Sequence, residues 1–351
     1  MTSVGLSTLD GGGNPYISLL YTALRTEGVS VEEAELHPWR LYPREKGYDV
    51  LHIHWPEYTL AGPGAGLAHN VRATAAALAL RMSVRTLRSR GVRIVWTAHN
   101  IRPHSPDAPA VQVNLYHWLA KDADAVIVHT KYAGQLVRER LGRVGPMYIA
   151  PHGNYLGVYD PPSLARTALR NRYGFAETDQ VLLAFGQISA YKRLVELATD
   201  FETFAPSSAR LLIAGAPKDL AVTQKLKELS AASHRIVLLD RYIPEIEVGE
   251  LYSLADLAVF NYSEIFSSGA LMLAFSFGLA VLAPRQGTDE LVGGPALFAW
   301  ESSPLEVLST ALEEPLDARR EAALNTAQTH RWVDAARVHI AAYEGGPPSL
   351  L

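Results

Sequence analysis

The fold of this chain is decided by the stretch Val181-Leu182-Leu183-Ala184-Phe185-Gly186-Gln187-Ile188-Ser189-Ala190-Tyr191-Lys192-Arg193. Its apolar run, 181–184, predicts a buried strand, and the glycine and helix-like pattern that follow predict a tight turn into a helix. The turn carries a hydroxyl and two adjacent cations, Lys192 and Arg193. Cations and free backbone N–H groups at a helix N-terminus bind diphosphates, so this unit indicates a phosphate site at a strand end.

A second stretch about seventy residues later has the same layout. The apolar run 257–260 is followed by Tyr262-Ser263-Glu264-Ile265-Phe266-Ser267-Ser268-Gly269 and then by a helix-like pattern. Its carboxylate can accept the hydroxyl protons of a ribose or hexose, and its hydroxyls and glycine suit a helix start. Together the two turns predict a sugar-nucleotide site.

Length and composition limit the class of protein. A chain of 351 residues exceeds a comfortable single core, and 48% apolar with 19% charged residues is typical of a globular protein. The absence of cysteine excludes disulfides and thiolate chemistry. No leader-like N-terminus and no apolar stretch of roughly twenty residues is present, so we expect a cytoplasmic location.

Strand-like and helix-like segments alternate along the chain, which predicts an α/β fold with parallel sheets and helices on both faces. Proline and glycine crowd between residues 150 and 162, so we predict domains over 1–155 and 156–329. We expect strands at 50–54, 93–98, 125–129, 181–185, 210–214, 236–239, 257–261 and 280–283. The tail from 317 to 344 reads as one long helix-like run.

The order of these motifs resembles that of the GT-B glycosyltransferases, closest to the family 4 type. The order runs from a glycine-rich N-terminal loop to Thr97-x-His99, the two turns and a tryptophan-bearing C-terminal helix, and it covers nearly the whole chain. The resemblance implies two Rossmann-like domains facing across a cleft. It also implies that the second domain holds the donor and that residues 330–351 pack back on the first.

Residue by residue, the resemblance implies that Lys192 contacts the donor diphosphate and that Glu264 binds a donor hydroxyl. Two positions depart from the pattern: Gln187 stands where an arginine is usual, and Met272 stands where a second glutamate is expected. The remaining donor-binding candidates are Gly186, Arg193, Ser267, Ser268 and Gly269.

The N-terminal half supplies candidates for the acceptor side and the chemistry. Gly12, Gly13 and Asn14 form a loop that allows close approach of a ligand or is merely a flexible turn. His99 matches the loop histidine that approaches the transferred sugar in family 4. The candidates for a catalytic base are His54, Glu57 and Asp10. Two histidines and a carboxylate at 52–57 make a weak metal motif, and we expect no metal and no cofactor beyond the co-substrate.

A basic stretch offers a hint about the acceptor. Residues 58–106 contain seven arginines and no acid, and the arginines at 81, 85 and 88 recur at helical spacing. The segment 72–93 could therefore lie on an anionic membrane surface, or it could be an ordinary solvated helix face. The basic residues lack interleaved aromatics, which disfavours nucleic-acid binding.

These observations predict a glycosyltransferase that moves a hexosyl group from GDP-mannose or a UDP-hexose to a glycan or lipid-linked acceptor. A sugar-nucleotide 2-epimerase of similar fold and a non-catalytic sugar-nucleotide-binding or scaffold protein are the alternatives. The sequence does not choose between retention and inversion of configuration.

Overall fold

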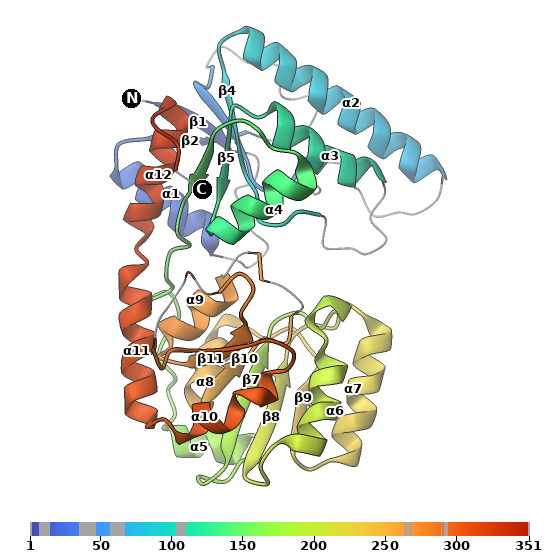
Figure 1. Cartoon of the computed structure of the whole chain (residues 1–351), viewed down its shortest axis with the longest axis vertical. Coiled ribbons are helices and arrows are strands. Elements are labelled where there is room, and N and C mark those ends of the chain that lie inside the picture. Colours follow the sequence, from blue (N-terminus) through green and yellow to red (C-terminus); the bar gives the residue numbers. More distant parts are fainter. Residues whose placement is uncertain are drawn as a thin grey trace. The chain divides into compact units, whose positions relative to one another are not determined.

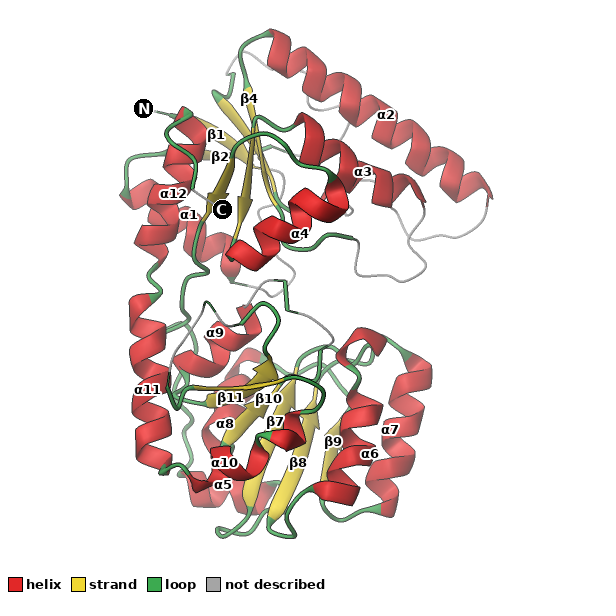
Figure 2. Cartoon of the chain, in the orientation of Figure 1, coloured by secondary structure: helices red, strands yellow, loops and turns green. Residues whose placement is uncertain are grey.

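A computed structural model of the chain describes residues 2–6, 15–34, 47–56, 67–102, 110–262, 265–266, 269–288, 290 and 294–349. The chain forms two compact units (Figure 1). Unit 1 comprises Met1–Gly153 and Arg331–Leu351, and unit 2 comprises Asn154–His330. Each unit has one sheet covered by helices (Figure 2), so the predicted α/β architecture with parallel sheets is confirmed.

The sheet of unit 1 has the strand order β2-β1-β3-β4-β5-β6, and every neighbouring pair is parallel. Its strands are β1 (Ser3–Leu6), β2 (Ser30–Glu33), β3 (Val50–Ile53), β4 (Arg93–Thr97), β5 (Ala125–Val128) and β6 (Met147–Ile149). Strands β3 and β5 are buried at every residue, as expected for a sheet covered on both faces. The chain runs from β1 outward to β2 and then returns to β3 on the other side, so β1 and β3 flank a topological switch point.

The helices of unit 1 are α1 (Tyr16–Thr26), α2 (Leu67–Ser89), α3 (Ala110–Asp122), α4 (Lys131–Leu141) and α12 (Trp332–Glu344). The last of these comes from the far end of the chain and packs on α1, β5 and β6. Arg93 donates from Nε to the backbone oxygen of Ala342 at 2.8 Å, and Tyr148 donates to that of Gly346 at 2.8 Å. These bonds fix the C-terminal segment to the sheet of unit 1.

The sheet of unit 2 has the order β12-β11-β10-β7-β8-β9, again with parallel neighbours. Its strands are β7 (Gln180–Phe185), β8 (Ala209–Ala214), β9 (Ile236–Leu239), β10 (Leu257–Val259), β11 (Ala280–Pro284) and β12 (Leu297–Trp300). Its α-helices are α5 (Arg166–Arg172), α6 (Leu194–Phe204), α7 (Leu220–Ala232), α8 (Glu245–Leu254), α9 (Gly269–Ser276), α10 (Leu308–Glu313) and α11 (Leu316–Thr329). Here β7 and β10 flank the switch point.

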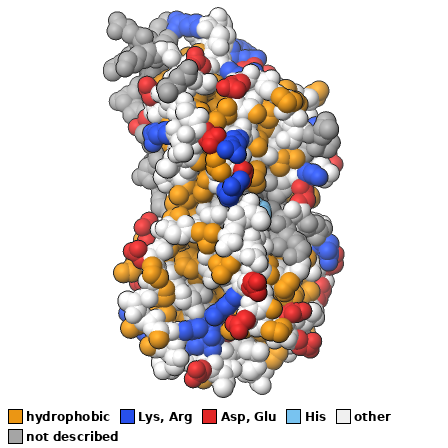
Figure 3. Space-filling view, turned by 90° about the vertical axis from the view of Figure 1, so that its left-hand side faces the viewer, with side chains coloured by type: hydrophobic (Ala, Val, Ile, Leu, Met, Phe, Trp, Pro, Cys, Tyr) orange, Lys and Arg blue, Asp and Glu red, His pale blue; other side chains and the backbone are white. Residues whose placement is uncertain are grey.

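A buried ion pair links β7 and β10 at their amino ends. Asp256, just before β10, accepts hydrogen bonds from Arg166, from the buried Arg170 and from the backbone of Val181 at the start of β7. The charges are therefore fully hydrogen-bonded, which offsets the cost of burying them. The ion pair of Asp256 is buried. On the face shown in Figure 3, by contrast, basic side chains lie at the surface with acidic ones near many of them.

The tail does not form one helix, so that prediction is wrong. Helix α11 ends at Thr329, and α12 begins at Trp332 after an extended Arg331 with ψ of 142°. The break coincides with the passage of the chain from unit 2 to unit 1. No helix of the described residues is long and apolar enough to cross a membrane.

Candidate functional site

The two turns that the sequence singles out lie at the carboxyl ends of β7 and β10, the strands that flank the switch point of unit 2. Ligands of doubly wound sheets bind at this position. Gly186 directly follows β7 and has a φ of +101°, and a Cβ there would lie 2.7 Å from Nζ of Lys192. Gly215, after β8, has a φ of +156°, and a Cβ there would lie 2.2 Å from the Gly186 oxygen. Gly215 is therefore required by the close approach of the two turns, and Gly186 is favoured by its positive φ.

Lys192 ends a short 3₁₀ turn, Ala190–Lys192, and its side chain folds back under the strand end. It is 5% exposed, and Nζ donates to the backbone oxygen of Phe185 at 3.0 Å. Burial lowers the pKa of Lys192 to about 7 because the charged ammonium is poorly solvated there. Lys192 is therefore only partly protonated near pH 7, and a nearby anion would raise its pKa again.

The turn after β10 contacts the Lys192 turn directly. Asn261 donates from Nδ2 to the backbone oxygen of Arg193 at 2.9 Å. The ring of Tyr262 lies 5.6 Å from Nζ of Lys192 and packs edge-on against Tyr191. Two segments seventy residues apart in the sequence therefore form one continuous surface.

The other donor-site candidates differ in position. Arg193 has a left-handed φ of 51°, and its side chain is partly exposed beside Glu196 at 3.9 Å. Gln187 is exposed, and Gly269 begins α9. Met272 lies in the core of unit 2 with 0% exposure, so the position of the expected second glutamate is an apolar packing site. Glu264, Ser267 and Ser268 lie outside the described residues.

In unit 1, the switch point places the end of β1 beside the end of β3. Strand β1 directly precedes the glycine-rich loop, and the sequence analysis missed this strand. The candidates Asp10, Gly12, Gly13, Asn14 and Glu57 lie outside the described residues. His54 follows β3 directly, and His99 follows β4 by two residues.

Four histidines stand in a row along the carboxyl ends of consecutive strands, and we call His54, His99, His129 and His152 the histidine row. They follow β3, β4, β5 and β6 in turn, and each is at most 8% exposed. The ring of Tyr16, at the start of α1, lies within 6 Å of all four, with the closest centroid distance, 4.9 Å, to His99.

Two further histidines lie beneath the row. Nε2 of His52 is hydrogen-bonded to the Thr97 hydroxyl at 2.8 Å, and Nδ1 of His52 is hydrogen-bonded to the Tyr343 hydroxyl at 2.8 Å. His339 of α12 has its ring centroid 5.5 Å from that of His52. The sequence analysis expected the C-terminal segment to pack on this domain, but it did not single out His339 or Tyr343 as part of the cluster.

Three of these six imidazoles have a fixed tautomer. The Nδ1–H groups of His129, His152 and His339 donate to backbone oxygens of Ala150, Gly153 and Ala335, which can only accept. Burial lowers the pKa of His129 and His339 to about 4, and it lowers the pKa of His52, His54 and His99 well below 6.5. These five rings are neutral at pH 7.

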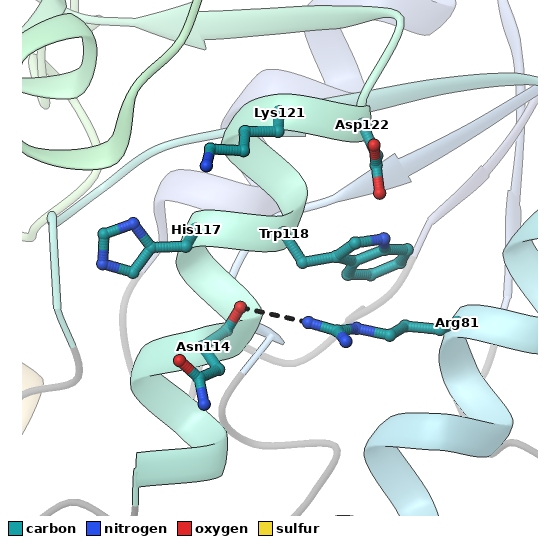
Figure 4. A pocket seen from close by; sticks show the side chains of 6 residues that line it. All are labelled: Arg81, Asn114, His117, Trp118, Lys121 and Asp122. Carbon is teal, nitrogen blue, oxygen red and sulfur yellow. Dashed lines mark hydrogen bonds between the residues drawn. The ribbon is translucent and has the colours of Figure 1, made fainter.

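A shallow hollow lies elsewhere on unit 1, between α2 and α3 (Figure 4). It measures about 340 Å³ and adjoins a second, more apolar hollow of about 320 Å³ that shares Arg81 and Asn114. Arg81 reaches across from α2, donates to the backbone oxygen of Asn114 at 3.4 Å and lies 5.4 Å from the Trp118 ring. His117 and Lys121 point along the other side of α3 (Figure 4).

No group of His, Asp and Glu within the described part of the chain has the arrangement of a metal site. The histidine row is instead held by backbone carbonyls and by ring packing.

The chain is similar to named sugar-transferring enzymes. The chain is 28% identical over 349 residues to a GDP-mannose:glycolipid 4-beta-D-mannosyltransferase of Xanthomonas campestris pv. campestris, covering 94% of this chain and 88% of that protein. A GDP-mannose-dependent alpha-(1-6)-phosphatidylinositol monomannoside mannosyltransferase of Mycolicibacterium smegmatis is 23% identical over 229 residues, covering 62% and 59%. No protein-family profile matches the chain.

Solved structures share the fold at low sequence identity. Sucrose-phosphate synthase of Thermosynechococcus elongatus superposes with a TM-score of 0.70 at 15% identity over 98% of this chain and 99% of that chain. Anabaena HepE in complex with UDP and glucose gives 0.67 at 15% identity over the same shares. The catalytic domain of starch synthase IV of Arabidopsis thaliana gives 0.69 at 12%, also over the same shares. The fold is GT-B.

Both units place candidate residues where doubly wound sheets bind ligands, and the named relatives transfer sugars from an activated donor. This chain is a nucleotide-sugar-dependent glycosyltransferase.

Proposed function

We propose that the chain transfers a mannosyl group from GDP-mannose to a lipid-linked acceptor. The observation that carries the donor half is the meeting of the Lys192 and Tyr262 turns at the switch point of unit 2. Mannose and a lipid acceptor are supported by the names of both relatives, each GDP-mannose-dependent and each acting on a glycolipid or phosphatidylinositol mannoside. Unit 2 is then the donor side and unit 1 the acceptor side.

In the donor site, Lys192 contacts the diphosphate, and its ammonium replaces the contact to Phe185 with one to a phosphate oxygen. The backbone of Gly186 and Gln187 borders the same space, and Arg193 adds a second cation. Ser267, Ser268 and Gly269 provide hydroxyl and N–H donors at the start of α9, which favours anions. Glu264 accepts a hydrogen bond from a hydroxyl of the sugar. Charge that develops on the leaving diphosphate is stabilised by these groups without proton transfer.

On the acceptor side, the described candidates His54 and His99 follow β3 and β4 at the carboxyl edge of the unit 1 sheet. The loop of Gly12, Gly13 and Asn14 follows β1, and Asp10 lies on it. The catalytic candidates are His99, His54, Glu57 and Asp10. The Xanthomonas relative is named for a beta linkage and the Mycolicibacterium relative for an alpha linkage. We favour beta because the match to the former covers more of this chain. Mannose is α-linked in GDP-mannose, so a beta product requires inversion and a base.

A transfer assay tests this function. The purified chain with labelled GDP-mannose and a panel of glycolipids and other lipid-linked oligosaccharides should yield a mannosylated lipid. The one-bond carbon–proton coupling at C1 of the new mannose should be that of a beta linkage. Transfer from UDP-glucose in place of GDP-mannose would contradict the donor assignment. A changed sugar in reactions with donor alone would instead support a 2-epimerase, and binding without turnover a non-catalytic protein.

We also propose that α2 lies on an anionic membrane, at the inner face of the plasma membrane. Val71, Leu78 and Met82 are 60%, 55% and 67% exposed and share one side of the helix. Arg81 and Arg85 flank them, and the two hollows between α2 and α3 extend this side with Arg81 between them. An apolar strip bordered by arginines fits the boundary between acyl chains and anionic head groups.

Vesicle sedimentation tests the membrane surface. The protein should bind vesicles that contain phosphatidylglycerol and should bind pure phosphatidylcholine weakly. The double substitution Leu78→Ser/Met82→Ser should reduce binding about tenfold or more, since full burial of such a side chain contributes about 1.5 to 3 kcal/mol. Leu220→Ser is the matched control, because Leu220 is 77% exposed on α7 of unit 2. Equal binding to both vesicle types would contradict the charge-dependent surface.

A further inference from the structure

We infer that His54 and His99 work as one unit in the transfer step: His99 takes the proton of the acceptor hydroxyl, and His54 holds the His99 ring in the tautomer that can take it. This inference rests on the proposed mannosyl transfer with inversion. It assigns to His99 a direct part in the reaction, and to His54 the part of a positioning residue.

The two rings are bonded to each other and locked in place. Nδ1 of His54 lies 3.0 Å from Nε2 of His99, and the side chains are 1% and 8% exposed. The His99 ring is stacked on Trp55 with centroids 4.4 Å apart and planes 19° apart. The edge of Tyr16 packs against it at 88°. Rotation of the His99 ring would require all three neighbours to move.

The hydrogen bond between two neutral imidazoles contains one proton, and its position decides the chemistry. If Nε2 of His99 carries the proton and donates it to His54, then Nδ1 of His99 keeps a lone pair and is a base. In the opposite arrangement Nδ1 of His99 carries the proton and cannot accept another. Among the described residues, Nδ1 of His99 has no hydrogen-bond partner, so this atom is left for the acceptor.

The other histidines of the row lack this property. Backbone carbonyls hold His129 and His152 with the proton on Nδ1, as they hold His339. In the described part of the chain, His54–His99 is the pair in which one imidazole is the hydrogen-bond partner of another. A neutral imidazole such as His54 has one acceptor nitrogen and one N–H donor. It can therefore accept the hydrogen bond from His99 and fix the His99 tautomer without removing the proton.

The pair also favours the transition state over the ground state. When the acceptor oxygen attacks C1 of mannose, its O–H bond breaks and the proton passes to Nδ1 of His99. The bond from C1 to the diphosphate oxygen breaks, and its electron pair leaves with the diphosphate. His99 is then an imidazolium whose Nε2–H donates to the His54 lone pair. A charge-assisted hydrogen bond is stronger than a neutral one, so the contact strengthens as the proton moves.

The titratable groups that face the pair come from every neighbouring element. They are His52 of β3, His129 after β5, His152 after β6, His339 of α12, and Tyr16 and Tyr21 of α1. None of these described groups is a carboxylate that could stabilise an imidazolium. His99 therefore holds its extra proton only briefly and releases it to solvent after each turnover.

Substitution of His54 separates positioning from packing. His54→Leu removes the acceptor, and we expect kcat to fall by about 10² to 10³ with donor affinity and KM unchanged, within the range of general-base effects. In His54→Asn the amide oxygen lies near the former Nδ1, and we expect kcat within about tenfold of the wild type. The acid limb of the kcat profile should move to lower pH in His54→Leu and return in His54→Asn. A kcat for His54→Leu within twofold of the wild type would overturn the inference.

Nitrogen NMR of the histidine-labelled protein gives a readout that needs no substrate. We expect the proton of His99 on Nε2 in the wild type, and a mixture of tautomers in His54→Leu. A proton on Nδ1 of His99 in the wild type would overturn the inference even if mannosyl transfer occurs. If the tautomer is as expected but no mannose is transferred from GDP-mannose, the proposed function is contradicted. The assignment of His99 as a base held by His54 would then apply to a reaction with another donor.

Discussion

At the scale of single residues, Lys192 shows how a fold changes the chemistry of a side chain. The sequence places a cation after an apolar strand, which predicts a phosphate ligand. In the structure this lysine is buried under the strand end against Phe185 and Tyr262, and burial lowers its pKa to about 7. The position of the residue could be predicted, whereas its pKa depends on atoms seventy residues away.

This pKa predicts that GDP binding weakens above neutral pH. Lys192 is neutral above pH 7 in the free protein, so it must take up a proton to face the diphosphate. Affinity should therefore fall as pH rises from 7.5 to 8.5, approaching tenfold for a whole pH unit. Calorimetry in two buffers of different ionisation enthalpy should detect about one proton taken up. A flat affinity over this range would mean that Lys192 does not face the diphosphate.

At the scale of elements, strands with long apolar runs were predicted within a residue or two, and the short strands β1, β2, β6 and β12 were missed. Strand β2 reads SVEE and contributes a single buried residue, Val31, so its local pattern is that of a loop. The meeting of His54 with His99 also has no local signal, since it depends on β3 and β4 being neighbours in the sheet. The alternation of side chains along a strand predicts that His52 and His54 share one face. The contact of His54 with His99 also requires β3 and β4 to be neighbouring strands, which the local sequence does not show.

At the scale of the whole molecule, the two units follow the same rule: the described candidate residues follow the carboxyl ends of parallel strands at or near the switch point of the sheet. The sequence supports this placement because the turns follow recognisable strands. It does not reveal the cluster that fills unit 1, where α12 supplies His339 and Tyr343 from the end of the chain.

The buried histidines predict that unit 1 is acid-labile. For His52, His54, His99, His129 and His339 the folded-state pKa lies below the unfolded value near 6.5. Their contribution to stability is therefore complete above pH 6.5 and is lost as pH falls toward the folded-state values. Each ring should steepen the fall in unfolding free energy by up to about 1.4 kcal/mol per pH unit.

Urea unfolding between pH 7 and 4.5, followed by tryptophan fluorescence in Trp300→Phe, checks this in unit 1. His129→Asn keeps a donor for Ala150 and removes one titrating ring, so it should flatten the slope by about one proton. His234→Asn, at an exposed histidine of unit 2, is the control. A free energy that stays constant over this range would show that the rings are solvated.

The central claim is that the two turns of unit 2 hold the diphosphate of the donor. Its most direct test is calorimetric titration of GDP into the wild type, Lys192→Ala and Lys225→Ala at pH 7. Hydrogen bonds to charged groups contribute about 1.5 to 3 kcal/mol, so Lys192→Ala should bind GDP about 10- to 150-fold more weakly. Lys225→Ala, at an exposed lysine of α7, should match the wild type. Equal GDP affinity in all three proteins, with each folded, would contradict the account.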